Sequence, residues 1–177
     1  MGTIRPPVPV QFFASVIFGG SGIPSGVEAE LARVIGPIGE KTQSAPFFQS
    51  PYYCPEMGEG LQRYFVLFEP LSDRERLADI KGETNGMEQA TAVRGRRAVN
   101  VDPGYMALEH VVLATTKGYA HRIYLGKGIF ADLTLLYENG SYRALRWTYP
   151  DYGGDELIGL FNRWRERYKR LLRCQRA

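Results

Sequence analysis

The sequence predicts an α+β fold, in which one mainly antiparallel sheet is covered by helices and the chain closes with a long C-terminal helix. Three observations carry this prediction. Runs rich in β-branched and aromatic residues, typical of strands, surround two segments of helical periodicity in the first hundred residues. The dipeptide Asn139-Gly140 lies between two alternating runs, as in a tight β-hairpin. Residues 155–173 place apolar side chains along one helical face.

A buried strand and a short helix are the first predicted elements. The run "PVQFFASVIF" (9–18) reads as a central strand that is apolar on both faces. Val27, Leu31 and Val34 or Ile35 then recur at helical spacing, before a stop at Gly36-Pro37. The connecting loop "GGSGIPSG" (19–26) matches neither G-x-x-x-x-G-K-[ST] nor G-x-G-x-x-G, so we interpret it as a connection rather than a phosphate cradle.

Two more strands and a second helix are expected next. "TQSAPFFQ" (42–49) and "LQRYFVLFEPL" (61–71) have strand composition. Ser72 and Glu75 form a capping box, which predicts that the second helix begins at Ser72. The buried stripe of this helix is expected to comprise Leu77, Ile80, Thr84 and Met87.

The second half of the chain is predicted to add strands and the final helix. "RRAVNVDPGYM" (96–106) reads as a strand broken by a turn at Asp102-Pro103-Gly104, and "ALEHVVLATT" (107–116) fits a helix or a strand, of which we favour the helix. Strands are expected over 121–128, 129–138 and 142–149. The apolar stripe of the terminal helix is Leu157, Phe161, Trp164, Tyr168 and Leu171 or Leu172. The order of the first half, β-α-β-β-α-β, is ferredoxin-like.

Length and composition indicate one ordinary globular domain, 1–177, whose basic end, 163–177, could fray. The net charge is only +3, but residues 163–177 carry seven basic side chains against one acid. Such an end attracts nucleic acid, although arginines on a terminal helix are more often its solvated face. Cys54 and Cys174 are read as reduced thiols of a cytoplasmic protein, and the apolar run 8–18 is too short to cross a bilayer, so no membrane association is expected.

Polar residues gather in a few segments that could form a site. Lys81, Asn85 and Glu88 share one face of the second helix, which is either a site or a solvated stripe. In a regular strand His121 and Arg122 point to opposite faces, so we expect only one of them, preferably Arg122, to face a site. Asp132 and Thr134 share a face and could meet either residue across a strand pair. Lys127 belongs to a turn and is expected to be solvated.

Several kinds of site are not supported. His110 and His121 are eleven residues apart and no H-E-x-x-H or paired C-x-x-C occurs, so no metal site is expected. No G-x-S-x-G nucleophile elbow is present either. The sequence identifies no cofactor, and it leaves open whether the protein is an enzyme and which oligomer it forms.

Our first hypothesis is that the protein binds or transforms an anionic small molecule, phosphorylated or nucleotide-like, in a cleft beside the second helix and the "DPGY" turn. His121 with Asp102 could transfer a proton near neutral pH, which makes them the candidate catalytic pair. The candidate ligand-binding residues are Arg122, Lys81, Asn85, Lys117, Arg63 and Asn100.

Two other functions are ranked below the first. RNA binding would use the basic last helix and exposed aromatic side chains such as Tyr52, Tyr53, Tyr119 or Tyr149. A non-enzymatic adaptor would use the same helix to pack on itself or on a partner.

Five blocks taken together carry a resemblance to a known family: "YYCPEMGEGLQRYF", "IKGETNGME", "RRAVNVDPGY", "LATTKGYAHRIYLGKGIFADLTLLY" and "WTYPDY". From about Val10 to Tyr168, the chain resembles a family of small prokaryotic proteins known as a domain of unknown function, some members of which are labelled GTP-binding. The chain has neither a Walker-type loop nor an N-K-x-D motif, and it departs from the family pattern in the loop 19–26 and at Asp132, where glutamate is usual.

The resemblance attaches no role to any residue. It implies recurring polar positions at Glu56, Glu59, Arg63, Lys81, Thr84, Asn85, Glu88, Arg97, Asn100, Asp102, Lys117, His121, Arg122, Thr134 and 149–152.

Overall fold

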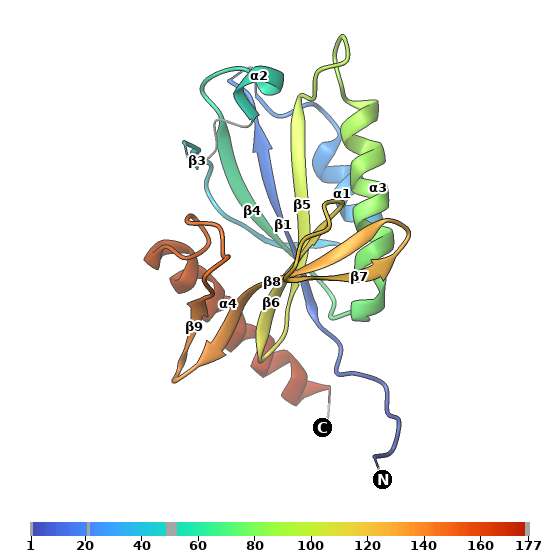
Figure 1. The fold of residues 1–177 in the computed structure, drawn as a ribbon, viewed down its shortest axis with the longest axis vertical. Helices are drawn as coiled ribbons and strands as arrows, with labels where there is room; N and C mark the ends of the chain where they lie inside the picture. The colour runs from blue at the N-terminus through green and yellow to red at the C-terminus, as the bar shows by residue number, and fades with distance from the viewer. Residues whose placement is uncertain (1, 21, 49–52, 176–177) are drawn as a thin grey trace.

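The fold is organised around a nine-stranded antiparallel sheet, as the computed structural model shows (Figure 1). The structure describes residues 2–20, 22–48 and 53–175. Ser21 of the predicted loop, Gln49 of the second predicted strand and Tyr52 lie outside the described residues. The predicted α+β class, with its mainly antiparallel sheet and long C-terminal helix, is confirmed.

The strands follow the path β2-β4-β1-β5-β6-β8-β7, with β3 paired to β4 and β9 paired to β8. Their bounds are β1 Gln11–Phe18, β2 Ile38–Lys41, β3 Ala45–Pro46, β4 Gln62–Phe68, β5 Val99–Met106, β6 His110–Thr115, β7 Arg122–Gly126, β8 Ile129–Glu138 and β9 Ser141–Ala144. The helices are α1 Val27–Val34, α2 Cys54–Met57, α3 Leu77–Ala90 and α4 Asp155–Cys174, and a 3-10 turn, η2, covers Arg74–Arg76.

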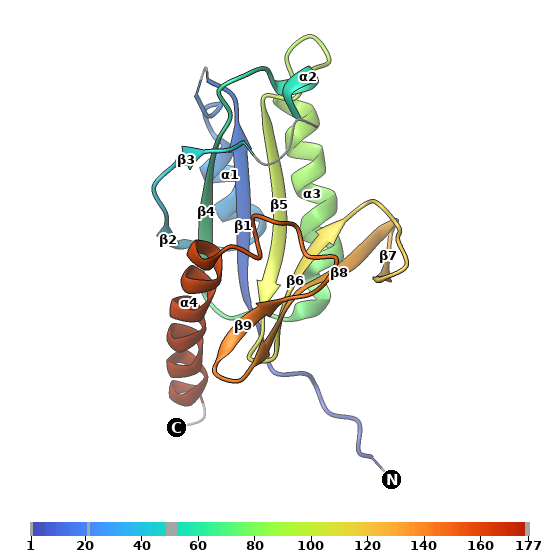
Figure 2. The same cartoon turned by 60° about the vertical axis from the view of Figure 1, so that its left-hand side comes forward.

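Strand β1 lies at the centre of the first half, between β4 and β5 and antiparallel to both. Its side chains alternate between two cores, as the pleat of a strand requires. Phe12, Ala14 and Val16 pack with α1 and α3 on one face of the sheet. Phe13 packs with α4 on the opposite face. Figure 2 shows α4 on the other side of the sheet from α1 and α3. Ser15 of β1 does not belong to the α4 core but lines a pocket.

Helix α4 has the predicted apolar stripe. The side chains that it buries are Leu157, Leu160, Phe161, Trp164, Tyr168 and Leu172. Some of its basic side chains also take part in the fold, since Arg165 Nε donates to Leu108 O at 2.9 Å and Arg167 forms ion pairs with Glu40 and Glu69. Within the described ranges, no helix combines the length and the apolar character that crossing a membrane requires.

Helix α3 begins later than predicted, at Leu77 after the 3-10 turn, and no side chain caps it. Ser72 is still extended, because its backbone pairs with Val10 through hydrogen bonds of 2.8 and 2.9 Å. Its hydroxyl accepts a hydrogen bond from Arg76 Nη1 at 2.9 Å. The predicted capping box with Glu75 is therefore wrong, whereas the predicted buried stripe of the helix is confirmed.

Four of the predicted assignments need correction. Residues 110–115 form strand β6 rather than a helix, and β5 runs unbroken through Pro103. The second strand of the predicted order is chiefly β2, which the sequence analysis missed, because β3 comprises only Ala45–Pro46. The strand expected over 142–149 ends at Ala144.

Both predicted hairpin turns are present. Asn139 and Gly140 have φ angles of 50° and 86°, so the β8–β9 turn has the left-handed backbone that this dipeptide favours. Lys127 occupies the β7–β8 turn, where its side chain is largely exposed, as predicted, and pairs with Asp79.

Candidate functional site

The sheet splits between β5 and β6. Backbone pairing of these strands covers only Gly104–Met106, whereas β6 continues through Thr115 alongside β8. Gly104 lies at the point where β5 and β6 meet, which we call the crossing. The close approach there requires glycine, because a Cβ atom would lie 2.5 Å from Val112 O and 2.8 Å from the Phe13 ring. Pro103 is tolerated inside the strand because β6 no longer pairs there, so its missing N–H leaves no ladder bond unmade.

Where β6 no longer pairs with β5, side chains of α3 lie along the edge of β5 instead. Lys81 Nζ donates to Val101 O at 2.8 Å, and Val101 N donates to Glu88 Oε1 at 2.8 Å. Buried backbone groups need such partners, so these two side chains replace a neighbouring strand. The face of Lys81, Asn85 and Glu88 therefore lies against the sheet edge, with Lys81 and Glu88 buried, and is not a solvated stripe.

Asp102 and Asn100 extend this capping interaction along β5. Lys81 Nζ lies 3.3 Å from Asp102 Oδ1, and Asn100 Nδ2 donates to Asp102 Oδ2 at 2.9 Å. Arg97 Nη1 donates to Asn100 Oδ1 at 2.8 Å. One continuous polar network thus follows the upper half of β5.

Arg97 also joins two glutamates of different exposure. It donates twice to Glu56, at 2.8 and 2.7 Å, and once to Glu88 at 3.1 Å. Burial raises the pKa of Glu88, and the nearby Lys81 charge acts against this rise. The hydrogen bonds from Arg97 lower the pKa of Glu56. The two carboxylates that share one guanidinium are therefore shifted in opposite directions.

The segment 145–154, which we call the strap, crosses the sheet face between β9 and α4. Trp147 Nε1 donates to Leu133 O at 2.8 Å, and Thr148 Oγ1 donates to Thr134 O at 2.6 Å. Arg63 of β4 forms an ion pair with Asp151, and its guanidinium carbon lies 4.6 Å from the ring centroid of Phe47. Hydrogen bonds at both ends thus hold the strap over the sheet.

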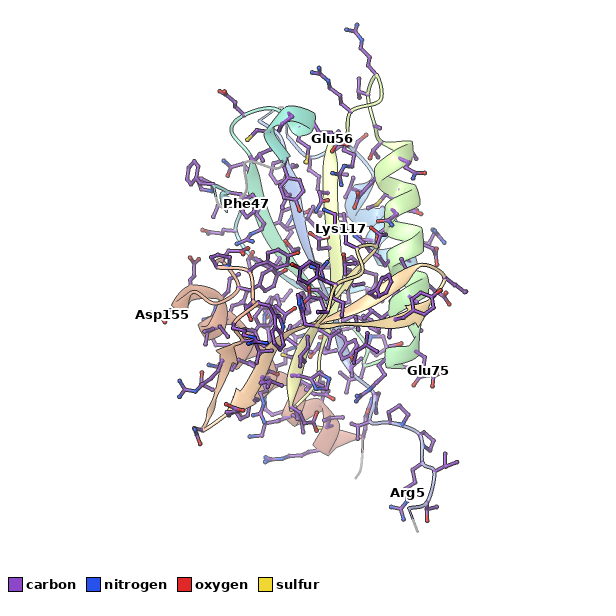
Figure 3. The ribbon with its side chains drawn as sticks, in the orientation of Figure 1. Arg5, Phe47, Glu56, Glu75, Lys117 and Asp155 are labelled. Atoms are coloured by element: carbon purple, nitrogen blue, oxygen red, sulfur yellow. The ribbon has the colours of Figure 1, made fainter. Side chains whose placement is uncertain are left out.

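The split in the sheet, α3 and the strap together enclose a pocket of about 470 Å³. Figure 3 shows Lys117 over the upper part of the sheet, between Phe47 and α3. The charged residues that line the pocket are Arg63, Lys81, Arg97, Lys117, Glu88, Asp102, Asp132 and Asp151. Aromatic walls come from Phe47, Tyr53, Tyr149 and Tyr152.

Tyr152 is a buried member of this lining. Its hydroxyl lies against Ser15 but makes no hydrogen bond of normal geometry with the described residues, and burial raises its pKa well above 10. The Asn85 side chain, half-buried in the pocket, likewise makes no hydrogen bond within residues 2–20, 22–48 and 53–175. Of these two groups, the half-buried Asn85 amide is the one exposed to the pocket.

His121 and Arg122 both contact Asp132. Arg122 Nε donates to Asp132 Oδ2 at 2.8 Å, as the predicted strand-pair contact requires, and its Nη1 donates to Lys117 O at 2.9 Å. His121 Nε2 lies 3.5 Å from the same carboxylate oxygen, and its ring stacks on Trp147 with a centroid distance of 5.0 Å. Both side chains reach one carboxylate because His121 precedes β7 and does not follow its alternation. The prediction that only one of the two faces a site stays a prediction.

The pocket brings together most of the predicted site residues. Six of them line it: Arg63, Lys81, Asn85, Asn100, Asp102 and Lys117. His121 and Arg122 are not in the lining but lie behind it, against Asp132. The contacts of Asp102 are with Lys81 and Asn100, so the structure does not pair it with His121.

Other lining residues were not among the predicted catalytic or ligand-binding residues, although Asp132 was offered as a contact of His121 or Arg122. Arg97, Asp132, Asp151 and Tyr152 belong to segments whose approach to the sheet depends on long-range packing. The block "WTYPDY" was a usable signal, because it combines a proline turn with polar and aromatic side chains. In the described part of the chain, no group of three or more His, Cys, Asp or Glu residues could hold a metal ion.

Comparison with known proteins gives one match. The family model described as "Domain of unknown function (DUF4416)" matches residues 8–168. No curated protein and no solved structure matches the chain.

Proposed function

The chain belongs to the family of domain of unknown function DUF4416, and from its site we propose that it binds a small molecule carrying an anionic group in the pocket between β5, α3 and the strap. The observation that carries this proposal is the convergence on one pocket of six residues from four segments of the chain: Arg63, Lys81, Asn85, Asn100, Asp102 and Lys117.

The dimensions and lining of the pocket favour a small molecule. Its volume of about 470 Å³ falls within the roughly 300–1,000 Å³ of ligand pockets. Aromatic side chains beside a few convergent polar groups are the usual lining of such sites. The Asn85 amide, which makes no hydrogen bond with the described residues, offers hydrogen bonds that would orient a ligand.

The preference for an anion rests on the cations of the lining. Lys117 is exposed on the loop that follows β6, so it is the cation that an entering ligand meets first. The Arg97 side chain is 23% exposed and is paired with Glu56 and Glu88, whereas Arg63 and Lys81 are more buried and are paired with Asp151 and Asp102. A phosphate or carboxylate would therefore bind near Lys117, with Arg97 in support.

The proposal assigns binding rather than catalysis. Asp132 is the carboxylate beside His121, at 3.5 Å. Any proton transfer through His121 would therefore use Asp132 in place of the predicted Asp102.

A thermal-shift screen of the full chain tests the proposal. The panel contains nucleotides, including GTP because similar proteins carry that label, together with sugar phosphates and carboxylates at millimolar concentration. We expect at least one compound to raise Tm, since a ligand at 100 times its Kd adds about 2.7 kcal/mol of stability. Lys117→Gln should reduce the shift, and Lys127→Gln, at an exposed lysine outside this pocket, should not.

Two results would count against the proposal. A panel without any stabilising compound is one of them. The other is an equal loss of the shift in Lys117→Gln and Lys127→Gln.

RNA binding through the basic end of α4 receives less support. Arg165 and Arg167 are engaged by Leu108, Glu40 and Glu69 of the same chain. Arg163, Arg170 and Arg173 are exposed and remain for such a role. Loss of RNA retention in an Arg163→Gln, Arg170→Gln, Arg173→Gln variant, with steep salt dependence, would favour this alternative.

A further inference from the structure

The carboxylates of the pocket differ sharply in exposure. The Asp102 side chain is 33% exposed, against 6% for Glu88, 5% for Asp132 and 9% for Asp151. The three buried carboxylates are each held by an arginine, whereas Asp102 is bound by Lys81 and Asn100. Asp102 is therefore the carboxylate that a ligand in the pocket can reach.

An ionised carboxylate only accepts hydrogen bonds, so a ligand that uses Asp102 must present a donor. Each oxygen of Asp102 has one protein donor and room for another, since Lys81 binds Oδ1 and Asn100 binds Oδ2. Asn85 lies one helical turn from Lys81 and its amide oxygen is a second acceptor without a protein donor in the described ranges. Two acceptors on this side of the pocket suit an amino group.

The opposite side of the pocket carries the opposite charge. Lys117 follows β6, whereas Asp102 lies on β5, and the pocket occupies the split between these two strands. The most exposed ionic groups of the lining are thus the Asp102 carboxylate on one side of the split and the Lys117 ammonium on the other, whereas Arg97 is held by Glu56 and Glu88. A ligand that fills the split is favoured when its own charges complement both groups, because hydrogen bonds between charged groups are stronger than neutral ones.

Resting on the proposed function, we infer that the ligand is a zwitterion: a molecule whose amino group binds Asp102 and Asn85 and whose carboxylate or phosphate binds Lys117. An anion without an amino group would leave Asp102 without a ligand donor and would bring a like charge toward it. An amine without an anionic group would leave Lys117 without a partner in the ligand.

Two matched sets of probes test the inference on the full chain. The first set is L-phenylalanine, 3-phenylpropionate and phenethylamine; the second is phosphoethanolamine, ethyl phosphate and ethanolamine. Calorimetry and thermal shift compare the zwitterion of each set with its anion and its amine at equal concentration. In at least one set the zwitterion should bind about tenfold more tightly than the anion, because it adds a charged hydrogen bond.

Variants separate the two ends of the ligand. Asp102→Asn should bring the zwitterion-to-anion affinity ratio close to one while the affinity of the anion is retained, and Lys117→Gln should weaken both compounds. Asn85→Ala serves as a second variant if Asp102→Asn does not fold, because Asn85 makes no hydrogen bond in the described structure; it should lower the same ratio. Asp79→Asn, at an exposed carboxylate on α3 outside this pocket, should change neither affinity.

A zwitterion that binds no better than its anion in both sets overturns the inference. An unchanged affinity ratio in both Asp102→Asn and Asn85→Ala overturns it as well. If nucleotides, sugar phosphates or simple carboxylates still stabilise the chain through Lys117, the proposed function survives. If no compound of either panel binds, both fail.

Discussion

On the side of β5 away from β1, the backbone hydrogen-bonding groups find partners in two different ways along the strand. Its lower half, Gly104–Met106, pairs with the backbone of β6. Beside its upper half, two side chains of α3 bind the N–H and C=O of Val101. Both arrangements satisfy buried backbone groups, but only the second leaves space beside the strand and places ionisable groups there.

The difference shows how a sheet can contain a pocket without losing its core. The other face of β5 is apolar throughout, and Val99 and Val101 are fully buried under α3. On the face of the pocket, Asn100 and Asp102 stand where the lower half presents Met106 to the α4 core. The polar network is therefore confined to the upper half of β5, where it occupies one edge and one face of the strand.

The largest expected effect comes from Gly104→Ala at the boundary between the two halves. The added Cβ would lie 2.5 Å from the Val112 carbonyl oxygen, so β5 and β6 must move apart. We expect a loss of about 3 kcal/mol or more in the free energy of unfolding, measured with urea. Gly82→Ala is the control, because open space surrounds that helical glycine and the change should stabilise by up to about 1 kcal/mol. Equal stability of Gly104→Ala and the wild type would contradict the assigned role of the crossing.

An intermediate effect is expected at Glu88, whose side chain replaces a strand. Glu88→Ala leaves the buried Val101 N–H without an acceptor and should cost about 2–3 kcal/mol, whereas Glu88→Gln keeps a carbonyl acceptor and should cost about 1 kcal/mol or less. Chemical denaturation at pH 7 checks the order. Glu83→Gln, on the exposed side of the same helix, is the matched control.

The pH dependence of stability should distinguish the wild type from Glu88→Gln. Burial raises the pKa of Glu88 above its ordinary 4.5, so its contribution to stability is present below pH 4.5 and is lost as the pH rises through the folded-state value. The wild type should therefore lose stability relative to Glu88→Gln as the pH rises from 4.5. The opposite trend would show that the ionised carboxylate is the stabilising form.

The smallest effect is expected at Glu56, the more exposed partner of Arg97. Its pKa is lowered from 4.5 by hydrogen bonds from Arg97, so its contribution is present above pH 4.5 and is lost as the pH falls through the folded-state value. Glu56→Gln should cost less than about 1 kcal/mol at pH 7, since the pair is partly solvated. The difference in the free energy of unfolding between Glu56→Gln and the wild type should vanish in acid, and a difference that persists there would contradict the role assigned to the ionised carboxylate.

The fold was largely predictable because its signals are local. Periodicity places α4 and its apolar stripe, and Asn139-Gly140 places a hairpin. The failures lie where distant segments override local preference: Val10 holds Ser72 extended, and pairing with β5 and β8 makes 110–115 a strand. Asp102-Pro103-Gly104 has turn chemistry, yet β1 and the crossing with β6 keep it extended.

The candidate site was predictable in its residue types more than in its pairings. Lys81 and Asn85 could be grouped from helical spacing alone, and both line the pocket. The partner of Asp102 could not be found in this way, since a lysine on a helix and an aspartate on a strand meet only after the sheet splits. The residue that contacts His121 is Asp132, which the sequence offered as one of its candidates.

The strap docks on the sheet late in folding. Its ion pair joins Asp151 to Arg63, which lies 88 residues earlier in the chain, so one wall of the pocket is added by a contact of very long sequence separation. Such contacts form late, because the entropy of closing a long loop must be offset by other interactions first. During synthesis the sheet strands up to β9 emerge before the strap and α4. The pocket is therefore complete only after the strap has docked on the sheet.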